Sequence, residues 1–193
     1  MKWRDVYKNQ LKQAGDSLKS IDYKSVEDFI DLINLTKGVV FFTGIGKNGH
    51  VAAKTASTYG SMNIKSFFID PVDALHGGMN IVQKDDILVA VSKSGCTGEL
   101  YHFLKQLKIK NKDVKIILIH SNPNSTCKEF SSLDIQIDIE NENDKFNIVP
   151  IASISIFTIF LQSIAVDMSY RNNLTETDFL SNHPGGSIGK LNK

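Results

Sequence analysis

Cysteine is scarce in this chain, with only Cys96 and Cys127 among 193 residues. Their spacing matches neither a disulfide framework nor a zinc site, which favours unpaired thiols in a reducing compartment. The N-terminal segment Met1–Asp5 also lacks the apolar core and small-residue cleavage site of a signal peptide. Together, these absences predict a cytoplasmic protein.

A strong charge of either sign is missing as well. Lys and Arg number 22 and Asp and Glu 21, so the formal net charge is +1, and the lysines are scattered along the chain. This composition excludes a broad basic surface for nucleic acid or anionic lipid. We therefore expect any bound anion to be held locally, by a few groups.

No uninterrupted hydrophobic run is long enough to cross a membrane. The longest apolar stretch, residues 151–166, is broken by serine, threonine and glutamine and is shorter than the roughly 20 residues a span requires. We interpret it as a buried core helix and expect no membrane partner. Internal repeats and low-complexity linkers are also absent, and the length predicts a single domain over residues 1–193.

What the chain does contain is an alternation of helix-like and strand-like segments. Residues 1–37 carry apolar side chains at helical spacing and predict one or two N-terminal helices. Over 38–193 the pattern predicts an α/β fold, a doubly wound five-stranded parallel sheet with helices on both faces. The predicted strands are 39–43, 66–69, 86–91, 115–120 and 133–139, and the predicted crossover helices are 48–62, 71–81, 97–110 and 123–131.

Two glycine-containing loops, Thr43–His50 and Ser92–Glu99, each follow a predicted strand and open a predicted helix. Helix N-termini leave backbone N–H groups without partners and carry partial positive charge, which favours anions. Ligands of doubly wound sheets also bind beyond the carboxyl ends of strands. The two loops therefore predict a site for a phosphorylated small molecule.

The first loop allows two interpretations. Gly44, Gly46 and Gly49 match a dinucleotide-binding pattern, and Asp70 lies where a ribose-binding acid is expected. Any tight strand-to-helix turn, however, favours glycine at such positions. Lys47 opposes the helix dipole unless an anion compensates it, so it either extends into solvent or faces an anionic substrate.

The second loop is rich in hydroxyl groups. Ser92, Ser94 and Thr97 flank Gly95, and their side chains would surround one terminal phosphate. A dinucleotide fold does not require this second loop. The alternative is that Thr97 or Ser94 caps the following helix, a role compatible with binding.

Four further side chains are candidates for proton transfer. Glu99 lies in a first helical turn, where acids complement the dipole, and Glu142 lies in a polar loop, where carboxylates are typically solvated. His76 and His183 stand beside glycine or proline, which argues against core positions. Histidine transfers protons near neutral pH, but none of the four identifies a reaction by its spacing.

The sequence resembles the D-arabinose 5-phosphate isomerase family within the sugar isomerase (SIS) superfamily. The resemblance covers essentially the whole chain, and other SIS proteins lack its most specific motif, the ending Asp178–Gly186. It implies a flavodoxin-like SIS domain. The motifs that carry it are Gly44–His50, Ala74–Gly77, Ser92–Gly95, Glu99 and Asp178–Gly186.

This resemblance implies interconversion of D-ribulose 5-phosphate and D-arabinose 5-phosphate through a cis-enediolate, without a cofactor or catalytic metal. The product would feed Kdo synthesis for lipopolysaccharide or capsule, and the assembly would be a homotetramer with shared sites. Which glutamate is the base, and which histidine relays protons, stays open. The implied catalytic residues are Lys47, Glu99, Glu142 and His183, and the implied substrate-binding residues are Gly46, Asn48, His76, Ser92, Ser94 and Thr97.

Some positions depart from the family pattern. Asp70 stands where the family often has a histidine linked to metal binding, and Ile151 replaces a threonine, so metal response and substrate choice stay open. Many members carry two CBS domains after the SIS portion, whereas this sequence ends at Lys193, which predicts no such regulation.

Two alternatives remain beside this expectation. One is another phosphosugar isomerase that shares the serine loop, and the other is a non-catalytic phosphosugar sensor. A sensor usually carries a DNA-binding module, and residues 1–37 show no basic recognition helix.

Overall fold

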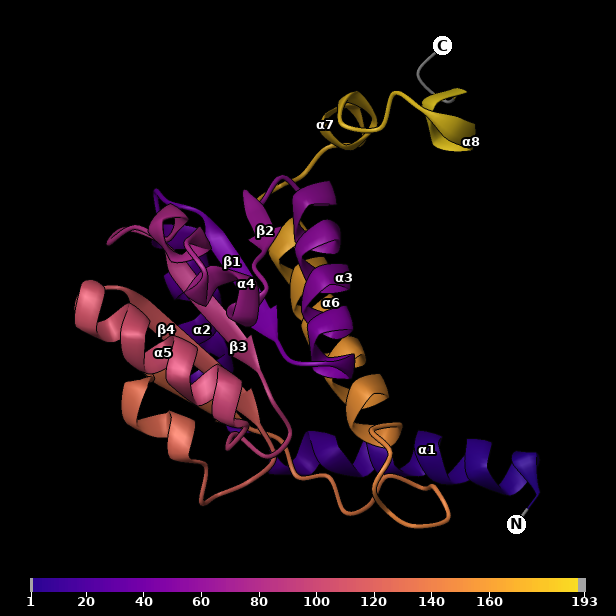
Figure 1. The fold of residues 1–193 in the computed structure, drawn as a ribbon. Helices are drawn as coiled ribbons and strands as arrows, with labels where there is room; N and C mark the ends of the chain where they lie inside the picture. Colours follow the sequence, from indigo (N-terminus) through magenta and orange to yellow (C-terminus); the bar gives the residue numbers. More distant parts are fainter. Residues whose placement is uncertain (1, 191–193) are drawn as a thin grey trace.

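Five parallel strands form a single sheet in the computed structural model, which describes residues 2–190 (Figure 1). The strand order is β2-β1-β3-β4-β5, so the sheet winds in opposite directions on either side of the β1–β3 pair. The prediction of a doubly wound parallel sheet is confirmed, with the order typical of flavodoxin-like folds. The strands are β1 (Val40–Gly44), β2 (Ser66–Phe68), β3 (Ile87–Val91), β4 (Lys115–His120) and β5 (Leu133–Gln136).

Helices cover both faces of this sheet. One apolar core joins the sheet to α2, α3 and α6, and a second joins it to α4, α5 and the 3-10 helix η3. Strand residues alternate between the two cores, so the sheet is the middle of three layers. The helices are α1 (Trp3–Ser17), η1 (Leu18–Ser20), α2 (Tyr23–Leu35), α3 (Lys47–Ser61), α4 (Pro71–Leu75), η2 (Gly78–Ile81), α5 (Gly98–Lys110), η3 (Thr126–Phe130), α6 (Ala152–Arg171), α7 (Glu176–Ser181) and α8 (Gly186–Gly189).

The long apolar segment forms α6, which is long and apolar enough by composition to cross a membrane. In this fold it is instead a core helix, because Phe157, Leu161 and Met168 are fully buried against the sheet and α3. The predicted core helix is thus confirmed, although it continues beyond residue 166 to Arg171.

Some predicted boundaries were wrong for identifiable reasons. The predicted helix 71–81 is divided into α4 and η2, because Gly77 has a φ of 122°, which helical backbone does not allow. Within 123–131 only the short helix η3 forms, and β5 ends three residues earlier than expected. Strand β2 lies at the sheet edge with Phe67 more than half exposed, so it is not covered on both faces.

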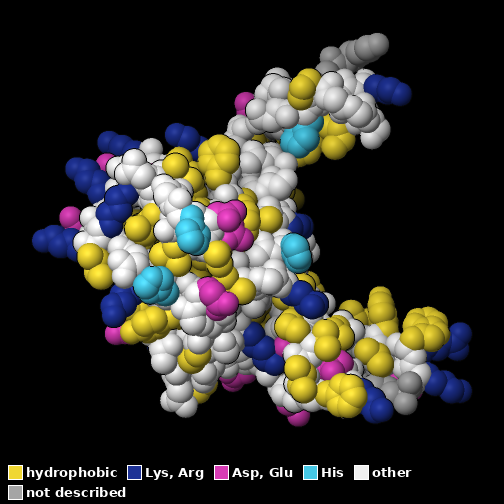
Figure 2. Space-filling model, in the orientation of Figure 1, with side chains coloured by type: hydrophobic (Ala, Val, Ile, Leu, Met, Phe, Trp, Pro, Cys, Tyr) yellow, Lys and Arg dark blue, Asp and Glu magenta, His cyan; other side chains and the backbone are white. Residues whose placement is uncertain are grey.

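Two arms extend from this body (Figure 1). Helix α1 projects from one end, and α7 and α8 project from the other. Between the arms, α3 and α6 line a concave side that is also visible in the space-filling view (Figure 2). Hydrophobic side chains gather on the α1 arm, where Trp3, Tyr7 and Leu11 are each more than half exposed.

The entry into β1 depends on a buried carboxylate. Asp86, only 6% exposed, accepts hydrogen bonds from the backbone N–H groups of Val39 and Gln83, both at 2.7 Å. A side chain at Gly38 would overlap with Asp86, so glycine is required there. The Asp86 carboxylate thus ties the start of β1 to the turn before β3.

Replacing Asp86 with alanine is expected to destabilise the fold by about 3 kcal/mol, because two backbone donors lose a charged acceptor. Urea denaturation measures this loss. The neighbouring Asp85 side chain is exposed, and Asp85→Ala should stay within about 0.5 kcal/mol of the wild type. Equal effects of the two changes would contradict the role assigned to Asp86.

Candidate functional site

The two glycine loops meet at the point where the sheet reverses its winding direction. They follow β1 and β3, which are neighbours and pair from Val40 with Ile87 to Gly44 with Val91. A side chain at Gly44 would come within 2.9 Å of the Val91 carbonyl oxygen. The absence of a side chain at Gly44 therefore allows the first loop to lie directly against the end of β3.

The rest of the first loop is shaped by its glycines. Gly46 has a φ of 58° just before α3, and a side chain at Gly49 would come within 2.9 Å of the Gly44 carbonyl oxygen. Lys47 is the first residue of α3 and is exposed. Within residues 2–190, the buried side-chain oxygen atoms Thr43 Oγ1 and Asn48 Oδ1 have no hydrogen-bond partner. Such orphaned acceptors at the end of β1 suit a ligand with hydroxyl groups.

The second loop is held rigidly by its own hydroxyl groups. Ser92 Oγ accepts the Gly95 N–H at 3.1 Å and lies 3.5 Å from Thr97 Oγ1, while Ser94 Oγ accepts the Cys96 N–H at 3.2 Å. Gly95 has a φ of 59°, which closes the loop.

The segment after β4 fixes this loop from outside. Ser125 Oγ donates to the Gly95 carbonyl oxygen at 2.9 Å, and the Asn122 side chain donates to the Ser94 carbonyl oxygen at 2.9 Å. The loop is therefore preorganised at the ends of β3 and β4.

The helix-capping alternative for Thr97 is wrong. Thr97 is the N-cap residue of α5, but its side chain makes no capping hydrogen bond. The first-turn N–H groups of α5 thus lack a capping side chain, which leaves them available to an anion.

Glu142 departs from the expected solvated loop carboxylate, since it is only 1% exposed. Its Oε2 accepts the backbone N–H groups of Ile151 at 2.8 Å and Ser153 at 3.0 Å, at the N-terminus of α6. Its Oε1 lies 2.7 Å from Nζ of Lys93 in the serine loop. Burial raises the pKa of Glu142, but the Lys93 ammonium and the two N–H groups outweigh it, so the net pKa lies below the ordinary value.

The Lys93 contact was missed by the reasoning from sequence. Lys93 lies between two serines of the predicted anion loop, at the same sheet edge as the segment that follows β5. A lysine within the predicted anion loop therefore indicated a charged group at the site, but nothing in the sequence spacing paired Lys93 with Glu142.

Glu99 and His76 are accessible. Glu99 occupies the first turn of α5 and is exposed, as the sequence indicated. His76 follows α4 at its C-cap, also exposed, beside the left-handed turn at Gly77. Both side chains are therefore free of burial in the body of the protein.

His183 is not brought to these residues within one chain. It follows α7 in an irregular connection, as expected, stacked on Phe179 with ring centroids 4.1 Å apart. Its Nε2 lies 3.3 Å from Ser61 Oγ, at the last residue of α3. Lys47 is the first residue of that 15-residue helix, so the two ends lie about 20 Å apart.

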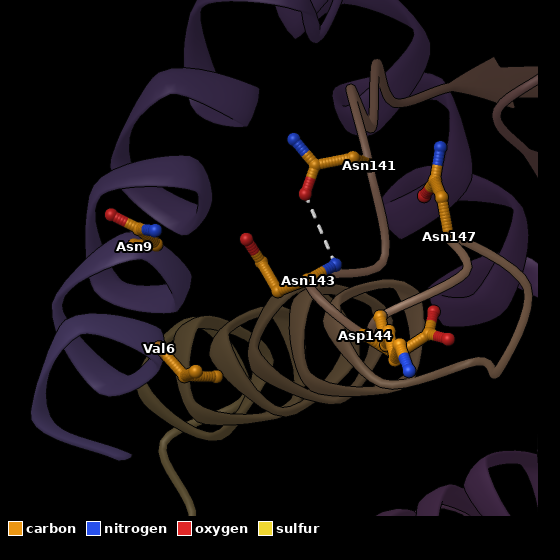
Figure 3. Close-up of a pocket in the computed structure, with 7 residues that line it drawn as sticks. Val6, Asn9, Asn141, Asn143, Asp144 and Asn147 are labelled. Carbon is orange, nitrogen blue, oxygen red and sulfur yellow. Dashed lines mark hydrogen bonds between the residues drawn. The ribbon is translucent and has the colours of Figure 1, made fainter. Parts of the chain in front are cut away.

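A cavity of about 770 Å³ lies between α1 and the loop that follows β5 (Figure 3). Its lining is rich in amides, including Asn9, Asn141 and Asn143, and Asn141 Oδ1 accepts the Asn143 N–H at 3.0 Å. None of the residues predicted to bind or transform a substrate lines it. The candidate site is therefore the loop cluster at the sheet edge.

Asp70 has a structural role that neither hypothesis from the sequence assigned to it. Its Oδ1 accepts the N–H groups of Val72 at 2.8 Å and Asp73 at 3.1 Å, so it caps α4. Among residues 2–190, His, Cys, Asp and Glu side chains form no group of three that could hold a metal ion. The strand order also differs from the dinucleotide-binding order 3-2-1-4-5-6.

Comparison with known proteins agrees with this geometry. A family model described as SIS domain matches residues 36–170. Arabinose 5-phosphate isomerase KdsD from Francisella tularensis is 33% identical over 189 residues, which cover 96% of this chain and 57% of that protein. Arabinose 5-phosphate isomerase KpsF from Escherichia coli is 33% identical over 187 residues, covering 97% and 57%. The chain thus spans little more than half the length of these curated relatives.

A solved structure is also similar. The structure of Escherichia coli CFT073 c3406 in complex with arabinose 5-phosphate matches with a TM-score of 0.88 and 27% identity, covering 95% of this chain and 100% of that one. The similarity therefore extends over nearly the whole of both chains.

The geometry of the serine loop predicts a specific sensitivity at Gly95. A side chain there would overlap with Ser125, and the positive φ adds strain of about 1–3 kcal/mol, so Gly95→Ala should lower the free energy of unfolding by at least that amount. Gly98 has open space around it at the start of α5, and Gly98→Ala should be neutral or slightly stabilising. Chemical denaturation compares the free energies of unfolding of the two variants. Equal values would contradict the close contact between Gly95 and Ser125.

Proposed function

Because the chain belongs to the SIS domain family, we propose that it is an aldose–ketose isomerase that interconverts D-ribulose 5-phosphate and D-arabinose 5-phosphate. The observation that supports the proposal is that the loop that carries Lys47 and the serine loop follow the paired strands β1 and β3, with Lys93 of the serine loop in contact with the buried Glu142 carboxylate. The two relatives named arabinose 5-phosphate isomerase support this choice of substrate.

The serine loop would bind the phosphate. Ser92, Ser94 and Thr97 supply hydroxyl groups, and the uncapped N-terminus of α5 supplies N–H groups and the positive end of its dipole. Since the loop is already held by contacts with the segment after β4, it would lose little conformational entropy when the substrate binds. Gly46 and Asn48, in the loop after β1, would contact the sugar hydroxyl groups.

Isomerisation requires a base that moves a proton between C1 and C2 and a group that stabilises the enediolate. Glu142 suits the base because its carboxylate is fixed at Oε2 by two N–H groups and is kept ionised. Glu99, in the first turn of α5, would assist from the exposed side of the site. Lys47 would stabilise the negative charge that develops on the enediolate oxygen.

His76 and His183 would relay protons between the sugar oxygens and open the ring form of the substrate. His76 is exposed at the end of α4, near the sheet edge. His183 lies at the far end of α3 from Lys47, so it would serve a site in another copy of the chain.

We propose a homotetramer on this basis. The exposed apolar stripe of α1 and the projecting C-terminal arm offer surfaces for further copies (Figures 1 and 2). Helix α6 also leaves Tyr170 78% exposed on the body of the molecule. Covering such side chains would stabilise an assembly through the hydrophobic effect.

We place the reaction in the cytoplasm, where its product would feed Kdo synthesis for lipopolysaccharide or capsule. The free thiols of Cys96 and Cys127 fit a reducing compartment. Residues 1–193 would act as a single SIS unit in this role.

Incubation of the protein with D-ribulose 5-phosphate tests the proposal. NMR should show D-arabinose 5-phosphate appearing, with solvent deuterium entering at C2. In the same assay, Glu99→Gln, Glu142→Gln and His183→Ala should each lower turnover at least 100-fold with the fold intact, the magnitude typical of general acid–base groups. Circular dichroism checks the fold of each variant.

Two outcomes would contradict this assignment. Near-normal turnover in all three variants would remove the catalytic roles of these residues. No new sugar phosphate with the wild type would favour a sensor or a different phosphosugar substrate.

Shared sites predict complementation between two inactive variants. Lys47→Ala and His183→Ala should each be inactive alone, but a mixture that exchanges subunits should regain part of the activity. Some sites would then combine Lys47 from one copy with His183 from another. Sharing would be contradicted if native mass spectrometry showed mixed oligomers while the activity of the mixture stayed at the level of the separate variants.

A further inference from the structure

Lys93 is the residue of the site that neither the resemblance nor the phosphate-binding hypothesis assigned. Its backbone carbonyl oxygen accepts the Ser121 N–H at 3.0 Å, which anchors the residue to the end of β4. From there its ammonium reaches Oε1 of Glu142 at 2.7 Å, and its side chain is one-third exposed. The pair joins the phosphate-binding loop after β3 to the loop between β5 and α6.

Resting on the isomerase function proposed above, we propose that Lys93 is a positioning residue that holds Glu142 ionised and fixes the orientation of its Oε1. Lys93 would contribute through Glu142, without itself contacting the reacting carbons.

The two oxygens of Glu142 have different environments. Oε2 is occupied by the N–H groups of Ile151 and Ser153, so this end of the carboxylate also fixes the start of α6. Oε1 has Lys93 as its ion-pair partner. Both oxygens therefore have fixed partners, and the carboxylate is held in one orientation with Oε1 turned toward the serine loop.

A buried carboxylate that lost its ammonium partner would bind a proton far more readily. Because the base must be deprotonated, such a change would appear as lost activity at low pH and recovery at high pH. Removal of a lysine that binds the substrate phosphate would give a different pattern, because KM would rise at every pH.

Other charged groups around Glu142 do not replace Lys93. Asp144 and Lys145, in the same loop, line the amide cavity beside α1, and the Asp144 carboxylate accepts N–H groups from Phe146 and Ile148. Helix α6 has no acidic residue in its first turn. From α1, Gln13 contributes only a neutral amide, which accepts the Asn141 N–H.

The test is the pH dependence of kcat/KM for Lys93→Met and Lys93→Arg. In Lys93→Met the acid limb should move to higher pH by at least about one unit, a tenfold change in proton affinity, while Lys93→Arg should keep it near the wild-type position. Lys128→Met is the control, because the Lys128 side chain is about as exposed as that of Lys93 and pairs with a different carboxylate, Asp134, at 3.0 Å. Its acid limb should not move.

A direct titration keeps the proposal independent of turnover. With ¹³C-labelled glutamate carboxyl groups, the Glu142 signal is assigned by its loss in Glu142→Gln and titrated in the unliganded protein. Its pKa should rise in Lys93→Met and in Lys93→Gln, the second variant serving if the first does not fold. An unchanged Glu142 pKa, or a pH-independent rise in KM with an unmoved acid limb, would overturn the proposal. If the wild type shows no isomerase activity but the Glu142 pKa still rises in the Lys93 variants, only the proposed reaction is overturned.

Discussion

Close packing of two glycine loops at one sheet edge is the constraint on which the candidate site depends. Gly44 must lack a side chain because the Val91 carbonyl oxygen occupies that space, and Gly95 must adopt a positive φ against Ser125. Gly44 thus allows the ends of β1 and β3 to lie close together, and Gly95 allows the serine loop to pack against the segment after β4. The groups proposed to bind the phosphate and the sugar hydroxyls all lie on these two loops.

Electrostatics at this edge combine backbone and side-chain charge. Helices α3, α5 and α6 each follow a strand, so their N-termini lie at the carboxyl-terminal edge of the sheet. Each N-terminus contributes partial positive charge there. Glu142 uses the third of these termini to remain ionised although it is buried, and Lys93 adds a full positive charge. A dianionic ester and a buried carboxylate can thus occupy neighbouring positions without strong mutual repulsion.

Two arms leave the body of the molecule and carry exposed apolar side chains. Helices α1 and α7–α8 extend past the body at opposite ends of α3, and apolar side chains stay exposed on α1. The position of His183 on the second arm gives this shape a chemical consequence, since a proton-transferring group would then depend on assembly. Activity and association would be linked through that arm.

The sequence by itself determined the strand and helix alternation, the positions of the two glycine loops and the buried nature of α6, because apolar periodicity and glycine requirements are local properties. It could not place Glu142, whose polar neighbours Asn141 and Asn143 made a solvated carboxylate the expected outcome. Only the tertiary structure paired Glu142 with Lys93 and set His183 beside Ser61 instead of Lys47. These contacts join residues 49 and 122 positions apart, and their partners are selected by how the sheet edge and the arms pack in space, which no local pattern encodes.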